Sequence, residues 1–370
     1  MEHGLDGVLG KTYGPPKPLQ MPRWNDLLQR FVIGLDATNP SALLRAPASE
    51  MSALLPHTYP IASWRGRSVE ERQLTLYKGE DYLCLHYPQP LIDGIHDFKT
   101  TIGIMHWLED MDTFAADVAA LHCARGEPNT LVTAMLETLV WLGAQSDASG
   151  DEDAGAQMSG QVSWVGKSSM QVTVELTLAP SNEQESASPP LPPIAIATFL
   201  MASRSLDLSS SVAVDMIKME TESQRKRFEI GSGMAAMRKE RRQGSFSSLT
   251  EASLSTSGNE LLVVTSPTTT DCDRNTSGST FGGHLIKLAF EHGIRVAHAT
   301  ERGKSVWFRA IEEASFLALV PIGSSLLMKG RVVEVLKLAE GASEIKVHVS
   351  GYLSSSVQAL DFFFWFEISN

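Results

Sequence analysis

The stretch "NTSGSTFGGHLIKLAFE", residues 275–291, contains residue types that together could polarise a carbonyl group. Asn275 stands seven residues before the glycine pair Gly282 and Gly283, and an apolar segment follows directly. A helix that begins at two glycines exposes backbone N–H groups without internal partners, and no Cβ atom keeps a ligand away. The helix dipole adds partial positive charge there. Such a glycine-containing helix N-terminus, which we call the mouth of the helix, stabilises a carbonyl oxygen that gains negative charge. Close packing of the helix would also explain the glycines.

The second requirement for this chemistry is an acid that activates water, and two acids have the same spacing. Glu291 lies nine residues after Gly282, and Asp112 lies nine residues after Gly103, within the apolar segment 102–122. The spacing predicts two equivalent buried helices that begin at Gly282 and Gly103. An acid on one helix could face the mouth of the other, and Asn275 could orient the water or the carbonyl without ionising.

Other catalytic patterns are weak in this sequence. The pentapeptide G-x-S-x-G of a serine-hydrolase elbow is missing. The run "GSGMAA", residues 231–236, nearly fits a dinucleotide-binding motif, but it follows charged residues and not a strand, so we interpret it as linker. The ten histidines are dispersed without metal-ligand spacing, which predicts no metal and no cofactor.

Composition narrows the class of protein. The chain of 370 residues is 43% hydrophobic and 20% charged, typical of a globular protein, and its net charge of -12 argues against a nucleic-acid partner. Three separated cysteines argue against a disulfide framework and favour a reducing compartment. No apolar run reaches the roughly 20 residues of a membrane span. The first residues show no legible targeting signal, because they lack an apolar core and carry acids.

The order of elements predicts an α+β protein with an internal repeat. Residues 51–210 and 261–370 each read as one long buried helix followed by antiparallel strands. Residues 211–260 read as a linker, with a charged helical run and then a Ser/Thr-rich loop. Residues 1–50 are punctuated by prolines and read as an N-terminal arm.

Several stretches resemble one known family. "DRNTSGSTFGGHLIKLAFE", "HWLEDMDTFAADVAALHC", "GQVSWVGKSSMQVTVEL" and "ATFLMASR" are similar to segments of hotdog-fold acyl-CoA thioesterases. They resemble most the double-hotdog subfamily that includes the mitochondrial long-chain enzymes of animals and fungi. The resemblance covers roughly residues 50–370 and implies two hotdog domains fused in one chain. In each, a long central helix is wrapped by a curved antiparallel sheet.

The resemblance also implies an activity and assigns roles to residues. It implies hydrolysis of acyl-CoA to free fatty acid and CoA by direct water attack, without a cofactor. In this scheme the Gly283 N–H polarises the thioester carbonyl beside Gly282, Asp112 activates water, Asn275 is the loop amide, and CoA leaves as a thiolate. In "WVGKSS", Lys167 and Ser168 would contact CoA, unless the stretch is only a turn with a solvated lysine.

A mirror site would use the mouth at Gly103 and the acid Glu291. It departs from the family pattern, because His96 stands where the loop asparagine is expected and only one glycine is present. Phe281 is a further departure, since many relatives outside the subfamily have histidine before the two glycines. We therefore predict one working site, made from Asp112 and the second mouth.

Two other functions stay open at this stage. One is a non-catalytic protein that binds or senses acyl-CoA. The other is a hydroxyacyl-CoA dehydratase that would use His284, the residue after the glycines. The resemblance further implies a homo-oligomer, such as a trimer of double units, and a mitochondrial location, with a cytoplasmic one left open.

Overall fold

The fold is described from a computed structural model, which covers most of the chain beyond residue 97. The described residues are 55–57, 75–78, 82–87, 98, 100–123, 129–143, 155–179, 193–219, 221–242, 262–275, 278–301, 303–338, 342–354 and 356–369. The arm predicted over residues 1–50 lies outside them, as does His96.

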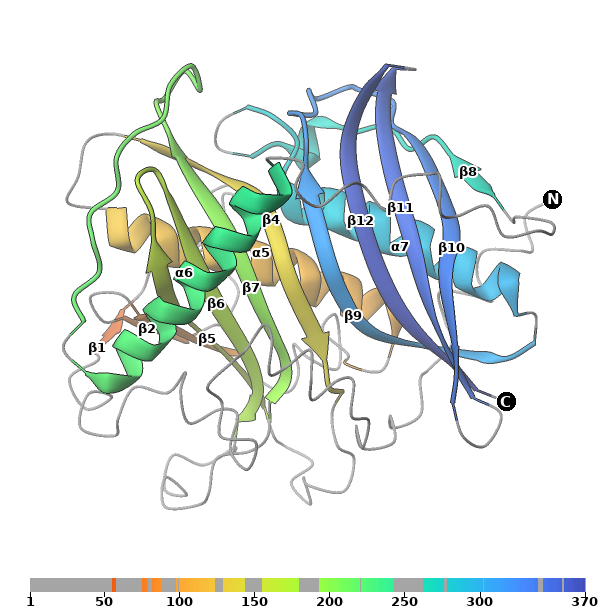
Figure 1. Ribbon diagram of the computed structural model, residues 1–370, viewed down its shortest axis with the longest axis horizontal. Coiled ribbons are helices and arrows are strands. Elements are labelled where there is room, and N and C mark those ends of the chain that lie inside the picture. Colours follow the sequence, from red (N-terminus) through yellow and green to blue (C-terminus); the bar gives the residue numbers. More distant parts are fainter. Residues whose placement is uncertain are drawn as a thin grey trace.

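A single antiparallel sheet of twelve strands organises these residues (Figure 1). Its strand order is β1-β2-β3-β5-β6-β7-β4-β9-β12-β11-β10-β8. The strands are β1 (Leu55–His57), β2 (Thr75–Lys78), β3 (Tyr82–Tyr87), β4 (Thr130–Trp141), β5 (Gly155–Val165), β6 (Ser169–Ala179), β7 (Pro193–Arg204), β8 (Val263–Thr265), β9 (Ser305–Phe316), β10 (Leu327–Lys337), β11 (Ser343–Ser354) and β12 (Val357–Ser369).

Three long helices lie on the two faces of this sheet. Figure 1 shows α5 (Thr101–Cys123) and α7 (Gly282–Thr300) behind the sheet and α6 (Glu222–Arg242) in front of it. Helices α5 and α7 also pack against each other. A short 3-10 helix (Asp271–Asp273) precedes α7.

The core lies between the sheet and the pair α5 and α7. Helix α5 is apolar nearly all round, and Trp107, Met111 and Phe114 on it are almost fully buried. On α7, Phe290 is buried against Phe308 of β9, at 4.9 Å between ring centroids. Strands β6 and β12 point alternate apolar residues into the same core, as their period of two requires.

The large antiparallel sheet and the helices that cover it agree with the predicted α+β class, and one order of elements occurs twice among the described residues. Helix α5 is followed by β4, β5, β6 and β7, and helix α7 is followed by β9, β10, β11 and β12. The two halves join where β4 pairs with β9, at Leu136↔Ala314 and Leu139↔Ile311. The junction between the halves, called the seam below, is therefore formed by backbone hydrogen bonds between β4 and β9, and the sheet continues across it without a break.

One detail of the sequence prediction was wrong. Helix α5 begins at Thr101 and not at Gly103, because Thr100 caps it: the Thr100 hydroxyl accepts the Gly103 N–H at 3.0 Å.

The charged helical run was predicted correctly as a helix, but α6 is also docked. A Cβ atom placed on Gly231 would lie 2.2 Å from the Trp164 Cβ, so this glycine lets α6 approach β5 closely. One turn on, Met234 is buried, and after another turn Arg238 forms an ion pair with Glu137 of β4. The "GSGMAA" motif is therefore a packing face of a helix.

Candidate active site

The structure brings Asp112 and the glycine mouth of α7 together. Asp112 lies midway along α5 and has no exposed surface. A Cβ atom placed on Gly282 would lie 2.9 Å from the Asp112 Oδ2 and 3.3 Å from the Thr133 Cβ. Gly282 is the first residue of α7, and the N-cap residue Phe281 makes no side-chain cap hydrogen bond. The carboxylate of one helix thus faces the uncapped N-terminus of the other.

The Asp112 carboxylate is held at one oxygen only. The Thr133 hydroxyl donates to Oδ1 at 2.7 Å, whereas Oδ2 has no hydrogen-bond partner among the described residues. Burial raises the pKa of Asp112 to about 7, and the nearby charge of Glu109 adds to this; the Thr133 hydroxyl and the Gly283 N–H act in the opposite direction. The Gly283 N–H thus attracts the carboxylate without meeting the geometry of a hydrogen bond. A carboxyl with a pKa near neutrality is suited to take a proton from water.

Thr133 is a site residue that the sequence reasoning missed. It is the fourth residue of β4, the strand that directly follows α5 in the chain. Its inward position is set by strand register, and a threonine in a strand is an ordinary residue with good β-propensity. The sequence therefore offers no signal that would single it out.

Asn275 lies in the loop that leads into α7. The side-chain Oδ1 of Asn275 accepts the Ser279 backbone N–H at 3.0 Å, and the backbone N–H of Asn275 donates to the Ser279 carbonyl at 2.7 Å. The Phe281 N–H then donates to the Asp273 carbonyl at 2.7 Å. These bonds fix the approach of the chain to Gly282. The contacts described here for Asn275 lie within its own loop.

Thr280, also missed, carries a second unsatisfied group close to the mouth in sequence. Its hydroxyl is buried and has no hydrogen-bond partner in the described part of the chain. Its N–H donates to the Val320 carbonyl at 2.9 Å. Buried hydroxyls are normally hydrogen-bonded, so Thr280 is an exception among the described residues.

Further charged groups surround the first turns of α7. The Glu109 carboxylate of α5 lies 3.4 Å from the Lys287 Nζ. The His284 Nδ1 lies 3.3 Å from the Asp273 Oδ1. His284, the residue that would serve a dehydratase, is therefore held by the loop carboxylate that precedes α7.

The mouth of α5 differs from that of α7. Its Gly103 N–H is already bound by Thr100. The acid Glu291 forms an ion pair with Arg295 on its own helix. Thr133 and Phe308 are each the fourth residue of a twelve-residue strand, so a phenyl ring stands in β9 where β4 has the hydroxyl.

Lys167 and Ser168 form the turn between β5 and β6. Lys167 is exposed, and its carbonyl accepts the Val214 N–H at 3.1 Å. Ser169 pairs with Ala202 of β7, which pairs with Val132 of β4. With strands about 4.8 Å apart, the turn lies about 10 Å from β4, at the end that carries Thr133.

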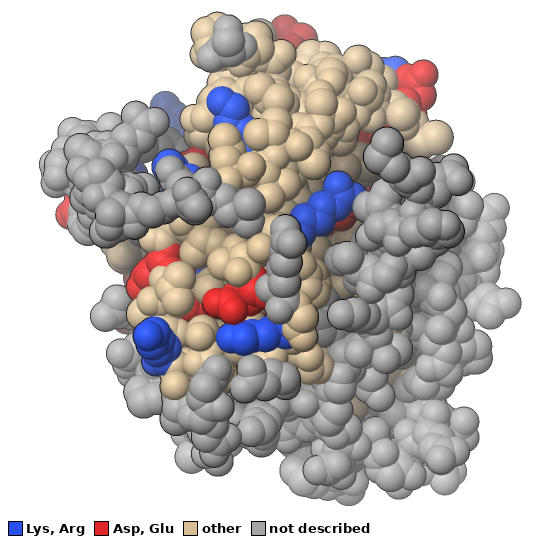
Figure 2. All heavy atoms as spheres, turned by 90° about the vertical axis from the view of Figure 1, so that its right-hand side faces the viewer, with Lys and Arg blue, Asp and Glu red and all other residues tan. Residues whose placement is uncertain are grey.

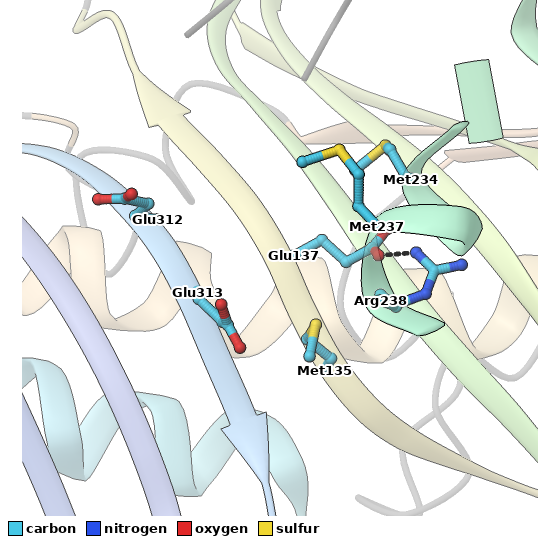
Figure 3. A pocket seen from close by; sticks show the side chains of 7 residues that line it. All are labelled: Met135, Glu137, Met234, Met237, Arg238, Glu312 and Glu313. Atoms are coloured by element: carbon cyan, nitrogen blue, oxygen red, sulfur yellow. Dashed lines mark hydrogen bonds and ion pairs between the residues drawn. The ribbon is translucent and has the colours of Figure 1, made fainter. Parts of the chain in front are cut away.

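A separate small pocket, partly open to solvent, lies on the face of the sheet that carries α6 (Figure 3). It is lined by Met135, Glu137, Met234, Met237, Arg238, Glu312 and Glu313. Figure 1 shows α6 on the opposite side of the sheet from α5 and α7, so this pocket is distinct from the glycine mouth.

The described residues also bear on two other classes of protein, those that cross a membrane and those that bind a metal ion. None of the described helices is long and apolar enough to cross a membrane. Within the described ranges, no cluster of three or more histidine, cysteine, aspartate or glutamate side chains could hold a metal ion. On the face seen in Figure 2, the described basic and acidic side chains are interspersed.

Comparisons with known proteins point to thioesterases. The chain is 26% identical over 255 residues to acyl-coenzyme A thioesterase 2, chloroplastic, of Humulus lupulus, a match that covers 61% of this chain and 56% of that protein. It is 24% identical over 271 residues to acyl-coenzyme A thioesterase 9, mitochondrial, of Bos taurus, covering 63% and 58%. The chain thus spans little more than half the length of the curated relatives it matches.

Among solved structures, the 12:0-ACP thioesterase from Umbellularia californica aligns with a TM-score of 0.43 at 9% identity, covering 72% of this chain and 87% of that one. No protein-family model matches the chain.

Proposed function

We propose that this chain hydrolyses acyl-CoA thioesters to free fatty acid and CoA. The observation that carries the proposal is the contact between Asp112 and the α7 mouth: a fully buried carboxylate, one oxygen of which has no hydrogen-bond partner among the described residues, next to a helix N-terminus without a side-chain cap. The names of the two curated relatives reported above, both acyl-coenzyme A thioesterases, support the same activity.

In the proposed mechanism, the thioester carbonyl accepts the Gly283 N–H at the mouth. The partial positive charge of the helix end stabilises the oxygen as the tetrahedral intermediate forms. Asp112 takes a proton from the attacking water, while Thr133 holds the other carboxylate oxygen in place. The C–S bond then breaks, and CoA leaves as a thiolate.

Asn275 is proposed to help orient the carbonyl or the water. Because its Oδ1 accepts the Ser279 N–H, this role falls to its amide N–H₂ donor. Asn275→Asp is therefore a sharper substitution than alanine, since a carboxylate keeps the acceptor for Ser279 and removes the donor. Lys167 and Ser168 are proposed to contact CoA at the same end of the sheet.

Only one of the two mouths is proposed to act. At the α5 mouth, Thr100 binds the Gly103 N–H, Arg295 pairs with Glu291, and β9 has Phe308 in the position of Thr133. Each difference removes a feature that the proposed reaction uses at the α7 mouth.

We also propose the finer assignments that the resemblance implies. The chain is a double-hotdog thioesterase of the mitochondrial long-chain subfamily, with hotdog domains at 51–210 and 261–370, a linker at 211–260 and an arm at 1–50. The repeated order of one helix and four strands supports the duplication. The proposal includes a mitochondrial location and a homo-oligomer built from these double units.

The test is thiol release from a panel of acyl-CoAs of increasing chain length, followed with a thiol-reactive dye, with calorimetry of CoA binding in parallel. Hydrolysis should be measurable for at least one chain length, and Asn275→Asp should lower kcat by about tenfold or more. If CoA binds tightly and no acyl-CoA is hydrolysed, the chain is a binding or sensing protein and the proposal is wrong.

A further inference from the structure

Helices α5 and α7 make a second polar contact, one turn away from the mouth. The Glu109 carbonyl lies 3.0 Å from where a Cβ atom on Gly283 would be. The Glu109 carboxylate, with only 5% of its side chain exposed, reaches the Lys287 Nζ of α7 at 3.4 Å. Asp112 and Glu109 are one turn apart on α5, and the residues they contact on α7, the glycine pair and Lys287, are also one turn apart. The two contacts are therefore successive steps of one helix crossing.

The charge of Glu109 acts directly on Asp112. The two acids are three residues apart on α5, so their side chains lie on the same side of that helix. A second negative charge disfavours ionisation of Asp112, and the pKa of Asp112 responds to Glu109 in this direction. Lys287 places a positive charge against Glu109 and reduces that repulsion.

We infer that the Lys287–Glu109 ion pair is a positioning device that sets the pH at which Asp112 becomes the base. It rests on the proposed role of Asp112. Lys287 touches neither the water nor the substrate in this scheme, and it acts through Glu109. The pair also ties the two central helices together, one turn from the mouth.

Among the described residues, two further titratable groups near the mouth are His284, in the first turn of α7, and Asp273, in the preceding loop, and they pair with each other at 3.3 Å. The Thr133 hydroxyl of β4 and the Gly283 N–H also act on the Asp112 carboxylate, and neither of them titrates. Substitutions in the Lys287–Glu109 pair therefore change the charge near Asp112 without altering a group that hydrogen-bonds the Asp112 carboxylate.

The test is the pH profile of kcat/KM for Lys287→Met, Glu109→Gln and the double variant. Lys287→Met removes the positive charge beside Glu109, so the apparent pKa of the rising limb should increase by about one pH unit. Glu109→Gln leaves Lys287 unpaired and should lower it. The double variant should return close to the native value, and Lys287→Arg should preserve it. Lys304→Met is the matched control, because Lys304 pairs with Glu301 at the far end of α7.

A readout without turnover separates this inference from the proposed function. The pH dependence of the unfolding free energy, compared between each variant and its Asp112→Asn counterpart, reports the pKa of Asp112 even in an inactive protein. It should move in the same directions as the kinetic profile. If Lys287→Met lowers the melting temperature while both readouts keep the native pKa, the pair is merely structural and the inference is overturned. If the unfolding readout moves but no acyl-CoA is hydrolysed, the proposed function fails and the tuning stands.

Discussion

Asp112 is the residue on which the account depends, because its environment suits chemistry better than stability. A carboxylate without exposed surface, one oxygen of which has no hydrogen-bond partner in the described part of the chain, costs folding free energy when it is ionised. The same burial raises its pKa to about 7, where a general base is most effective. Thr133 offsets part of the cost at Oδ1.

This cost predicts a particular pH dependence of stability. The pKa of Asp112 is about 7 in the folded chain, and the ordinary aspartate value of 3.8 applies in the unfolded chain, so between these pH values the folded chain binds more protons than the unfolded one. The contribution of Asp112 to the unfolding free energy therefore falls as pH rises through this window, by up to about 1.4 kcal/mol per pH unit. Asp112→Asn removes this loss.

The measurement is urea denaturation of both proteins at pH 5 and pH 8. The stability of Asp112→Asn relative to the native chain should increase between the two pH values by about 2 kcal/mol. Glu291→Gln serves as the control, and its stability relative to the native chain should stay nearly constant. If the unfolding free energies of Asp112→Asn and the native chain change equally between pH 5 and pH 8, the pKa of Asp112 in the folded chain is close to normal.

Gly282 is the second residue-scale test. In Gly282→Ala the new Cβ would lie 2.9 Å from the Asp112 Oδ2, so the carboxylate must move. We expect kcat/KM for the best acyl-CoA to fall by about tenfold or more, because catalysis depends on placement to within about 1 Å. The melting temperature should change by only a few degrees. Full activity in this variant would mean that the carboxylate does not act from this position.

Sequence reasoning found only part of this site. Asn275, Gly282 and Asp112 stand in local stretches that resemble those of hotdog thioesterases, so they could be proposed as site residues from the sequence. Thr133 and Lys287 could not be found this way, since their contacts depend on strand register and on the crossing of α5 and α7. Neither quantity is written in a local stretch of sequence.

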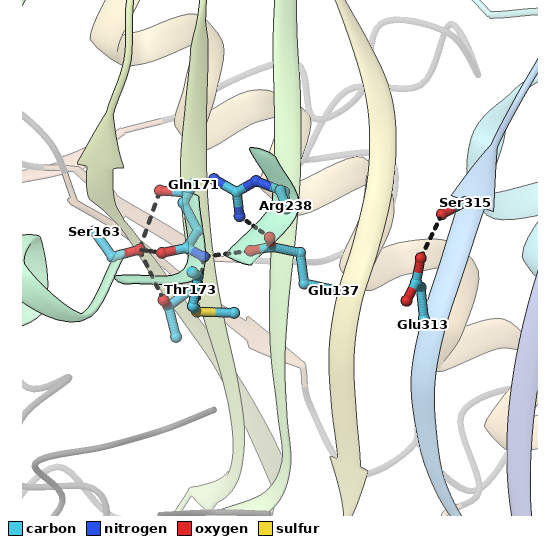
Figure 4. Close-up of polar contacts among 8 residues, drawn as sticks. Glu137, Ser163, Gln171, Thr173, Arg238, Glu313 and Ser315 are labelled. Carbon is cyan, nitrogen blue, oxygen red and sulfur yellow. Dashed lines mark hydrogen bonds and ion pairs between the residues drawn. The ribbon is translucent and has the colours of Figure 1, made fainter. Parts of the chain in front are cut away.

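At the scale of elements, α6 has a reason to dock on the first half. Glu137 and Glu312 are each the eighth residue of their strand, β4 and β9. On β11, Lys346 lies 2.6 Å from Glu312 and balances its charge, whereas Glu137 is hydrogen-bonded by the neutral Gln171 of β6 (Figure 4). The missing positive charge comes from Arg238 of α6, which also lies over the Trp164 ring at 5.3 Å.

Two glycines of α6 provide a matched test of this docking. A Cβ atom on Gly231 would collide with Trp164, whereas one on Gly233 would meet nothing within 4 Å. Gly231→Ala should therefore destabilise the protein by about 1–3 kcal/mol. Gly233→Ala should stabilise it slightly, since alanine favours the helix by about 1 kcal/mol. Thermal unfolding checks both, and equal effects would mean that α6 is not seated on β5 as described.

At the scale of the whole molecule, the candidate site exists only because two halves share one sheet. Asp112 and Thr133 come from the first half, and Gly282 and Gly283 come from the second. The order of helix and strands was predictable from hydrophobic periodicity. The β4–β9 pairing that joins the halves was not, because either strand could have remained an edge as far as its own sequence shows.

This arrangement predicts cooperative unfolding of the full chain. Trp107 of the first half lies in the core between the sheet and the pair α5 and α7, and Trp365 of the second half packs with Val140 of β4 and Ala310 of β9 at the seam. Loss of acyl-CoA hydrolysis, tryptophan fluorescence and circular dichroism should follow a single transition in urea. Two separated transitions would show that the halves unfold independently and that the seam is weak.

The most direct test of the central claim compares Asp112→Asn with Glu291→Gln in the full chain, by steady-state thiol release from the preferred acyl-CoA. We predict that Asp112→Asn lowers kcat by about 100-fold or more, while Glu291→Gln keeps nearly native turnover, with both proteins folded by circular dichroism. The opposite result, full activity in Asp112→Asn and none in Glu291→Gln, would place the chemistry at the α5 mouth and contradict this account.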